Sequence, residues 1–206
     1  MSEKLEKVVG DLLRDRGWRL AVAESCTGGL VGHRITNIPG SSTYYMGSIT
    51  AYAYEAKVRL LGVQWTTLEN YGAVSKQVVI EMARGVRRAL AADIGMSVSG
   101  IAGPGGGTAD KPVGLTCFGL STANDELAWQ IIWNGDRIVI DDSVSSRIHN
   151  LNSRIRVRAI PERHDNDISP IRTPIRYGAA PLDARRHLIL IGIPHFDGSV
   201  HATTSK

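Results

Sequence analysis

Residues 19–36 read RLAVAESCTGGLVGHRIT, and this stretch decides the fold. The mostly apolar run at 19–23 predicts a strand, and residues 30–36 predict a helix that ends before Pro39 and Gly40. Between them lies a polar loop with a carboxylate, two hydroxyls, a thiol and two glycines. A strand that passes through such a loop into a helix is typical of α/β proteins, whose ligands bind where strands end and helices begin.

The flanking sequence predicts three further helices. Apolar residues recur at helical spacing over residues 5–13 and 78–90, and the second stripe follows Ser75, a favourable N-cap. A shorter helix is expected over 55–61, because Gly62 follows it as a natural C-terminal stop.

The remaining ordered segments are expected to be strands. Residues 44–52 and 94–99 are rich in the residue types that strands favour. Two extended runs, 113–122 and 127–133, flank a turn and predict a β-hairpin at the edge of the sheet. We therefore expect an α/β fold, a three-layer α/β/α sandwich with a mixed, mostly parallel sheet and a C-terminal β-hairpin.

Composition limits the classes of protein to which the chain can belong. With 206 residues, of which 43% are hydrophobic and 21% charged, it can bury one ordinary core. It has no apolar run of about 18 residues and no secretory signal pattern at its start, so we expect a cytoplasmic protein without a membrane partner. Three of its four net positive charges lie beyond residue 137, scattered among prolines and acids, which argues against binding of nucleic acid.

A second loop, residues 99–114, reads SGIAGPGGGTADKPVG and has five glycines among residues 100–107. So much glycine is costly in backbone entropy unless a ligand or sharp turns require it. The loop is neither a dinucleotide fingerprint, since Thr108 occupies the position of its third glycine, nor a P-loop. We expect the two loops to form one ligand site. No metal is expected there, because His33 is the only histidine before residue 138.

Nucleophilic chemistry remains open to these loops. Ser25 would lie near a helix N-terminus, but its hydroxyl needs a base, and without a suitable histidine Lys57 is the candidate. The alternative is that Lys57 is a solvated residue on a surface helix. Cys26 is the rival nucleophile, yet His33 lies about two helical turns beyond it, too remote for a Cys–His pair.

Five ordered motifs strengthen this interpretation. They are AESCTGG at 23–29, PGSS at 39–42, EAK at 55–57 with LGV at 61–63, GAVS at 72–75, and SGIAGPGGGT at 99–108 with KPVG at 111–114. Together they resemble the CinA C-terminal domain family, the nicotinamide mononucleotide deamidases. The resemblance implies that a nucleotide amide is hydrolysed, giving nicotinic acid mononucleotide and ammonia. It also implies that no cofactor is needed and that the protein is a homo-oligomer.

The resemblance further implies roles for individual residues. Ser25 would be the nucleophile, Lys57 its base, and Tyr52 a hydroxyl that assists proton transfer. Ser99 would help to hold the amide oxygen or the sugar phosphate, and Arg137 would bind the phosphate. The other substrate-binding positions implied by the motifs are Thr27, Gly28, Ser42, Gly100, Gly105 and Gly106.

Two features depart from the family pattern. Ala53 and Tyr54 replace a serine and an asparagine before the EAK motif, which favours a second interpretation, a non-catalytic nucleotide-binding or regulatory relative. Beyond residue 137 a closing helix is expected in the family, whereas residues 138–206 are rich in Arg, Pro and His. We therefore divide the chain into an amidase-like domain, 1–137, and an irregular tail, 138–206, with at most a short helix at 143–151. The tail is either an out-of-frame end or a partner-binding extension.

Overall fold

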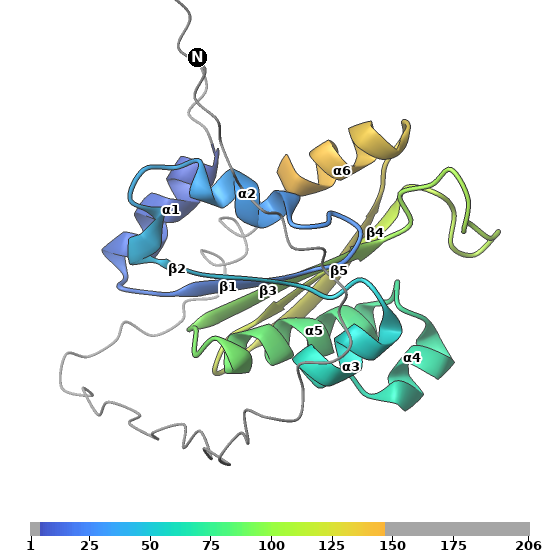
Figure 1. Ribbon diagram of the computed structural model, residues 1–206, viewed down its shortest axis with the longest axis horizontal. Helices are drawn as coiled ribbons and strands as arrows, with labels where there is room; N and C mark the ends of the chain where they lie inside the picture. The colour runs from blue at the N-terminus through green and yellow to red at the C-terminus, as the bar shows by residue number, and fades with distance from the viewer. Residues whose placement is uncertain (1–4, 147–206) are drawn as a thin grey trace, which may run out of the picture. The chain divides into compact units, whose positions relative to one another are not determined.

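Five strands form one mixed sheet in the order β2-β1-β3-β4-β5 (Figure 1), in a computed structural model that describes residues 5–146. β1 pairs in parallel with both β2 and β3, whereas β4 is antiparallel to β3 and to β5. Only β4 therefore runs against the other strands, which confirms the mixed, mostly parallel sheet and its C-terminal hairpin. The strands are β1 (Leu20–Glu24), β2 (Tyr45–Thr50), β3 (Ile94–Gly100), β4 (Leu115–Ser121) and β5 (Glu126–Ile132).

Helices cover both faces of the sheet, which confirms the three-layer sandwich (Figure 1). Each face buries its own apolar cluster, one including Val22, Met96 and Phe118 and the other including Ala23 and Met82. One layer contains α1 (Leu5–Asp15), α2 (Leu30–Thr36) and α6 (Arg137–Ser146); the other contains α3 (Tyr54–Leu61), α4 (Trp65–Tyr71) and α5 (Lys76–Ala89). A 3-10 turn, η1 (Ser41–Thr43), precedes β2.

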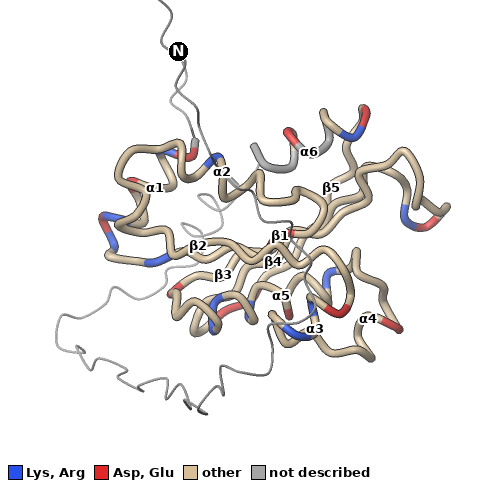
Figure 2. Tube along the Cα trace, in the orientation of Figure 1, with Lys and Arg blue, Asp and Glu red and all other residues tan. Residues whose placement is uncertain are grey.

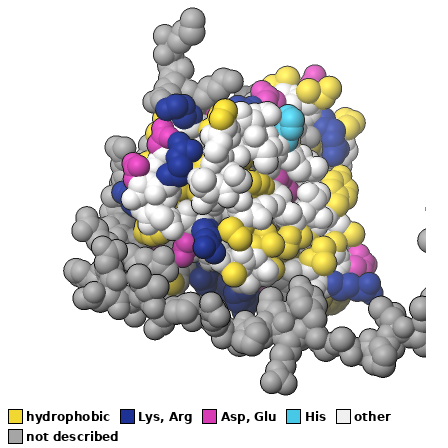
Figure 3. Space-filling view, turned by 60° about the vertical axis from the view of Figure 1, so that its left-hand side comes forward, with side chains coloured by type: hydrophobic (Ala, Val, Ile, Leu, Met, Phe, Trp, Pro, Cys, Tyr) yellow, Lys and Arg dark blue, Asp and Glu magenta, His cyan; other side chains and the backbone are white. Residues whose placement is uncertain are grey.

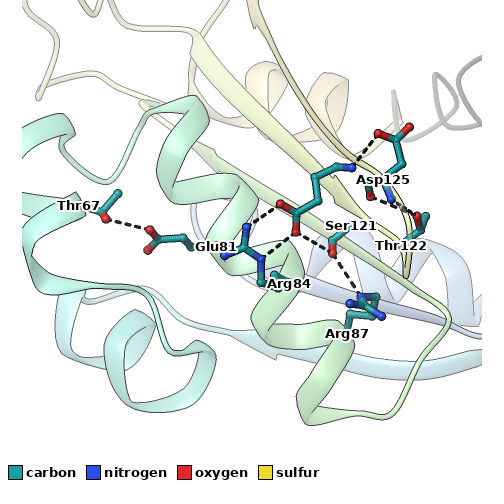
Figure 4. Close-up of polar contacts among 8 residues, drawn as sticks. Thr67, Glu81, Arg84, Arg87, Ser121, Thr122 and Asp125 are labelled. Carbon is teal, nitrogen blue, oxygen red and sulfur yellow. Dashed lines mark hydrogen bonds and ion pairs between the residues drawn. The ribbon is translucent and has the colours of Figure 1, made fainter.

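Polar contacts attach α5 to its neighbours (Figure 4). The predicted N-cap is confirmed, since Ser75 Oγ accepts a hydrogen bond from the Val78 amide. Arg84 donates two hydrogen bonds, of 2.8 and 2.6 Å, to the carboxylate of Glu126 at the start of β5. Thr67 Oγ1 of α4 donates to Glu81 of α5 at 2.8 Å. The contact with Glu126 joins α5 to the hairpin, and the contact with Thr67 joins α5 to α4.

Two helices were not predicted at their observed positions. α4 is seven residues long, too short to show an apolar stripe. α6 begins at Arg137 and crosses the predicted boundary between domain and tail, and Arg34 of α2 donates to Asp142 of α6 at 2.8 Å. Residues 138–146 are thus helical rather than irregular, and the rest of the predicted tail, residues 147–206, lies outside the described residues.

Several large apolar side chains are exposed, and Figure 3 shows side chains of this kind at the surface, beside charged ones. Within residues 5–146, no helix is long and apolar enough to cross a membrane. The exposed side chains on or beside α3 and α4 are those of Tyr52, Tyr54, Leu60, Trp65 and Tyr71.

Candidate active site

The candidate site lies where β1 and β3 end. Ser25 directly follows β1, and its amide donates a hydrogen bond to the carbonyl of Val98 in β3 at 3.1 Å. Because Glu24 and Val98 are register partners, the next residues along, Ser25 and Ser99, follow them in line on the two strands. Both serines are buried, with exposed fractions of 7% and 1%.

Lys57 reaches this edge of the sheet from α3. Its side chain is 1% exposed, and Nζ lies 3.0 Å from Ser25 Oγ. Nζ also donates to two main-chain carbonyls, those of Ala51 at 2.8 Å and Tyr52 at 2.9 Å. The alternative of a solvated surface lysine is therefore wrong.

Burial changes the proton affinity of this lysine. It lowers the pKa of Lys57 from 10.5 to about 8, because an ammonium group loses solvation inside the protein. The nearby Cys26 thiol opposes part of this decrease in the pKa. None of the three acceptors of Lys57 is a carboxylate. The neutral amine is therefore accessible close to neutral pH.

The three acceptors also determine how a neutral Lys57 is oriented. A neutral amine has two N–H donors and one lone pair, whereas the ammonium form has three donors. With the two N–H groups bonded to the carbonyls of Ala51 and Tyr52, the lone pair faces Ser25 Oγ. The serine hydroxyl then donates to the amine, which is the arrangement that a general base requires.

The next strand continues the site beyond Ser99. Ser99 pairs in register with Cys117 of β4, whose thiol is buried. Burial raises the pKa of Cys117, and the positive charges of Lys111 and Lys76 partly oppose this rise. The charge of Lys111, in the second predicted loop, thus acts on the register partner of Ser99. The Lys111 ammonium group is bonded to the carbonyl of Tyr71 at the end of α4.

Arg137, the first residue of α6, connects the glycine-rich loop to the segment between β2 and α3. One guanidinium nitrogen donates to the carbonyl of Gly103 in the glycine-rich loop at 2.9 Å, and the other to Tyr52 Oη at 3.2 Å. The Tyr52 side chain is 63% exposed. Tyr52 thus meets Lys57 through its carbonyl, whereas its hydroxyl meets Arg137.

Two other predicted site residues do not lie where the motifs implied. Ser42 belongs to η1, which precedes β2, whereas Ser25 lies level with the far end of β2, about 20 Å away for a strand of this length. Thr27 is near Ser25, but its hydroxyl is buried and donates to Glu24 at 2.7 Å, so it is not open to a substrate. Within the described residues, the structure thus does not bring Ser42 to Ser25, and it engages the Thr27 hydroxyl with Glu24.

The predicted glycines differ in the space around them. A Cβ at Gly28 or Gly105 would meet no atom within 4 Å, and both lie in exposed turns with room for a ligand. Gly106 is similarly exposed and has a φ of 85°, which favours glycine. A Cβ at Gly100 would come within 3.0 Å of Cys26 Sγ, so this glycine serves close packing behind the loop.

The N–H groups at the start of α2 are bonded within the protein and are not available to an anion. The amides of Gly29, Val31 and Gly32 donate to the carboxylate of Glu24, at 3.0, 3.1 and 2.9 Å. The position of Glu24, just before a helix N-terminus, was a signal for this role, because such a carboxylate is attracted to the N-terminal amides.

The family model of the CinA C-terminal domain matches residues 2–154 of the chain. The chain belongs to this family. The match extends through α6, which again places this helix within the domain.

Sequence relatives and solved structures agree with CinA membership. CinA-like proteins of Salinibacter ruber and Chloroherpeton thalassium are 52% and 45% identical to it, over 60% and 71% of this chain. The matched part covers only 30% and 36% of those relatives, so the chain spans about a third of their length. The crystal structure of competence damage-inducible protein A from Klebsiella pneumoniae superposes with a TM-score of 0.72 at 30% identity, covering 75% of this chain and 96% of that one.

Proposed function

We propose that this CinA chain hydrolyses the amide of nicotinamide mononucleotide to nicotinic acid mononucleotide and ammonia. The observation that carries the proposal is the contact between Lys57 Nζ and Ser25 Oγ, made by a lysine whose other acceptors are main-chain carbonyls. Such a pair supplies both a nucleophile and a base that is neutral close to physiological pH.

In the first half of the reaction Ser25 Oγ attacks the amide carbon, and its proton moves to Lys57 Nζ. The tetrahedral intermediate collapses when its C–N bond breaks, and Lys57 returns the proton to the leaving nitrogen, which departs as ammonia. An ester between Ser25 and the nicotinoyl group remains. Lysine can perform both transfers because its pKa, about 8, lies near the working pH.

In the second half a water molecule attacks the ester carbonyl and gives a proton to Lys57. Breaking the ester bond releases the carboxylate product, and Ser25 recovers its proton from Lys57. The carbonyls of Ala51 and Tyr52 keep Nζ in place through both halves, because they accept its other hydrogens throughout. The main chain therefore replaces the carboxylate that orients a catalytic histidine in other serine hydrolases.

We assign the rest of the nucleotide to the residues around this pair. Ser99, level with Ser25 on β3, is suited to hold the amide oxygen or the sugar phosphate. Arg137 supplies a positive charge between the glycine-rich loop and Tyr52, and a guanidinium group is a strong partner for a phosphate. The open space beside Gly28 and Gly105 leaves room for the ribose.

The non-catalytic alternative rests on Ala53 and Tyr54, whose own contacts are separate from the hydrogen bonds of Lys57. The Tyr54 ring lies edge-on to Trp65 with centroids 6.3 Å apart, and its hydroxyl accepts a hydrogen bond from the Ala73 amide. Ala53 is the N-cap of α3 and has no side-chain acceptor for the helix amides. Lys57 Nζ bonds to Ser25 Oγ and to the carbonyls of Ala51 and Tyr52, and the side chains of Ala53 and Tyr54 are not among these partners.

The test is ammonia release from nicotinamide mononucleotide by the full chain and three variants. We expect Ser25→Ala and Lys57→Met each to reduce kcat at least about a thousandfold. The two residues act as one catalytic unit, and loss of either member removes most of its contribution to the rate. Ser97→Ala is the matched control. It removes a buried serine hydroxyl that donates to the Val79 carbonyl, away from Lys57, and should leave kcat unchanged. Full activity in Ser25→Ala would overturn the proposal.

A further inference from the structure

The Glu24 carboxylate is buried beside the nucleophile without a cationic partner among its hydrogen bonds. Only two residues of the five strands are charged, Glu24 and Glu126, and Glu24 belongs to β1, an inner strand of the sheet. In Figure 2 the strands are almost entirely free of the colours that mark charged residues. Its exposed fraction is 0%. A carboxylate in such a position is stable only if its oxygens accept several hydrogen bonds.

Five donors satisfy this carboxylate. Oε2 accepts from Thr27 Oγ1 at 2.7 Å and from the amides of Gly29 and Val31. Oε1 accepts from the Gly32 amide at 2.9 Å and from Ser48 Oγ at 3.1 Å. Four of the donors belong to the turn after Ser25 and the first residues of α2, and the fifth belongs to β2.

Two glycines after Ser25 allow the backbone to approach the buried carboxylate of Glu24. Gly29 has a φ of 108°, a conformation that directs its amide to Glu24 and that other residues rarely adopt. A Cβ at Gly32 would lie 2.5 Å from Tyr45 Oη and 2.6 Å from Ser48 Oγ, so only glycine lets α2 approach β2. The motif that resembled a ligand-binding loop thus cradles a side chain of the protein itself.

The main chain of Glu24 also reaches the base. Its carbonyl accepts a hydrogen bond from the Ala51 amide at 2.8 Å, and the Ala51 carbonyl accepts one from Lys57 Nζ. The next peptide unit is that of Ser25. Glu24 is therefore bonded to the segment that holds the base and is covalently joined to the nucleophile.

We propose that Glu24 is a positioning residue, whose carboxylate locks the turn that presents Ser25 Oγ to Lys57. This inference rests on the proposed function for its catalytic consequence. It also means that the substrate's anionic group binds elsewhere, because Glu24 occupies the N-terminal amides of α2. Glu24 itself touches neither reacting atom.

Glu24→Gln is the most direct test. The amide group of glutamine replaces one accepting oxygen by a donor, so at least one of the Gly29, Val31 and Gly32 amides loses its acceptor and the turn must shift. A misplacement of about 1 Å reduces catalysis on the order of a hundredfold. We therefore expect kcat per competent site to fall about a hundredfold, with KM for nicotinamide mononucleotide changed less than about threefold.

The measurement counts the active sites in which Ser25 can still be labelled. A smaller number of such sites reports loss of folded protein, whereas a lower rate per site reports misplacement of Ser25. A fluorophosphonate labels activated serines covalently, and intact mass gives both the fraction labelled at Ser25 and the labelling rate. Glu126→Gln is the matched control, because Glu126 also accepts several side-chain hydrogen bonds but lies on β5. It should change stability and leave both kcat per site and the labelling rate unchanged. Glu24→Asp keeps the charge and should recover part of the rate.

Each outcome decides the proposal. A kcat per site in Glu24→Gln within about threefold of the wild type would overturn it. If Glu24→Gln does not fold, Glu24→Asp carries the test, and failure of both to fold would make Glu24 a folding residue only. If the wild type labels at Ser25 but releases no ammonia, the proposed function fails while the labelling rates still test Glu24. An unreactive Ser25 in the wild type would overturn both.

Discussion

Lys57 Nζ lies 3.0 Å from Ser25 Oγ, although 32 positions separate the two residues in the chain. α3 places Lys57 beside the residue that follows β1. Burial without a carboxylate among its hydrogen-bond partners lowers the pKa of Lys57 to about 8. The same burial that makes Lys57 a usable base also makes its charged form costly. Both consequences can be measured as functions of pH.

The activity should depend on pH through Lys57. Only the neutral amine accepts the proton of Ser25, so kcat/KM for ammonia release should rise with pH and level off above about 8. Initial rates between pH 6 and 10, at substrate concentrations below KM, give the apparent pKa of the free enzyme. A kcat/KM that is constant or decreasing from pH 6 to 9 would contradict Lys57 as the base.

The stability of the protein should also rise with pH through Lys57. The pKa of Lys57 is about 8 in the folded state and 10.5 in the reference state, so between these values the unfolded chain binds more protons. The free energy of unfolding of the wild type should therefore rise with pH over this interval, relative to Lys57→Met, by at most about 3 kcal/mol. Urea titrations of both proteins at pH 7, 8.5 and 10 measure the difference. If the free energies of unfolding of the two proteins change with pH in the same way, the pKa of Lys57 is not lowered by folding.

The sequence predicted most of the sheet because its strands and hairpin have clear local patterns. The Ser25 and Lys57 pair came from residue type and motif resemblance, but the orientation of Lys57 could not be predicted. It depends on the carbonyls of Ala51 and Tyr52, and backbone acceptors leave no mark in the sequence. The position of Ser42 at the opposite end of β2 from Ser25 could not be predicted either, because a motif does not show at which end of a strand it lies.

The N-terminus of α2 shows a second limit of sequence reasoning. A run of glycines after a polar loop indicates that something approaches the backbone, but not whether that is a ligand or a side chain. Here it is Glu24, which the same motif contains. α6 was placed too late because its ten residues have no strong apolar stripe, and its contact with Arg34 is a tertiary one.

Ala53 offers a stabilising substitution at the start of α3. It occupies the N-cap with an extended conformation, a φ of −75° and a ψ of 161°, but has no side chain that can accept from the helix amides. Ala53→Ser should increase the free energy of unfolding by about 1 kcal/mol, as serine caps do. Chemical denaturation at pH 7 measures this. Ala53→Val adds volume without an acceptor, and an equal gain in that variant would refute capping as the cause.

The ion pair between Arg84 and Glu126 should stabilise the protein only above acidic pH. The hydrogen bonds from Arg84 lower the pKa of Glu126, so their contribution is complete above the ordinary glutamate pKa and is lost as the pH falls through the lowered value. Glu126→Gln should cost less than about 1 kcal/mol at pH 7, because the pair is partly exposed. Thermal unfolding at pH 7 and pH 3 should show a difference only at the higher pH, and a persistent difference at pH 3 would rule out the charge as its source.

Arg137 should discriminate between substrates with and without a phosphate. If its guanidinium group binds the phosphate, Arg137→Gln loses a charge-assisted hydrogen bond worth about 1.5 to 3 kcal/mol, which raises KM for nicotinamide mononucleotide roughly tenfold or more. Nicotinamide riboside lacks the phosphate, so its kcat/KM should change less than about threefold.

The contacts of Arg137 with Gly103 and Tyr52 make a second explanation testable in the same experiment. If Arg137 only holds the glycine-rich loop against Tyr52, its loss should affect both substrates equally, because the site itself would be disturbed. Arg34→Gln is the matched control, since Arg34 contacts Asp142 of α6 and leaves Arg137 in place. This variant should loosen α6 without changing the preference between the two substrates. Equal losses for both substrates in Arg137→Gln would assign the phosphate to another residue.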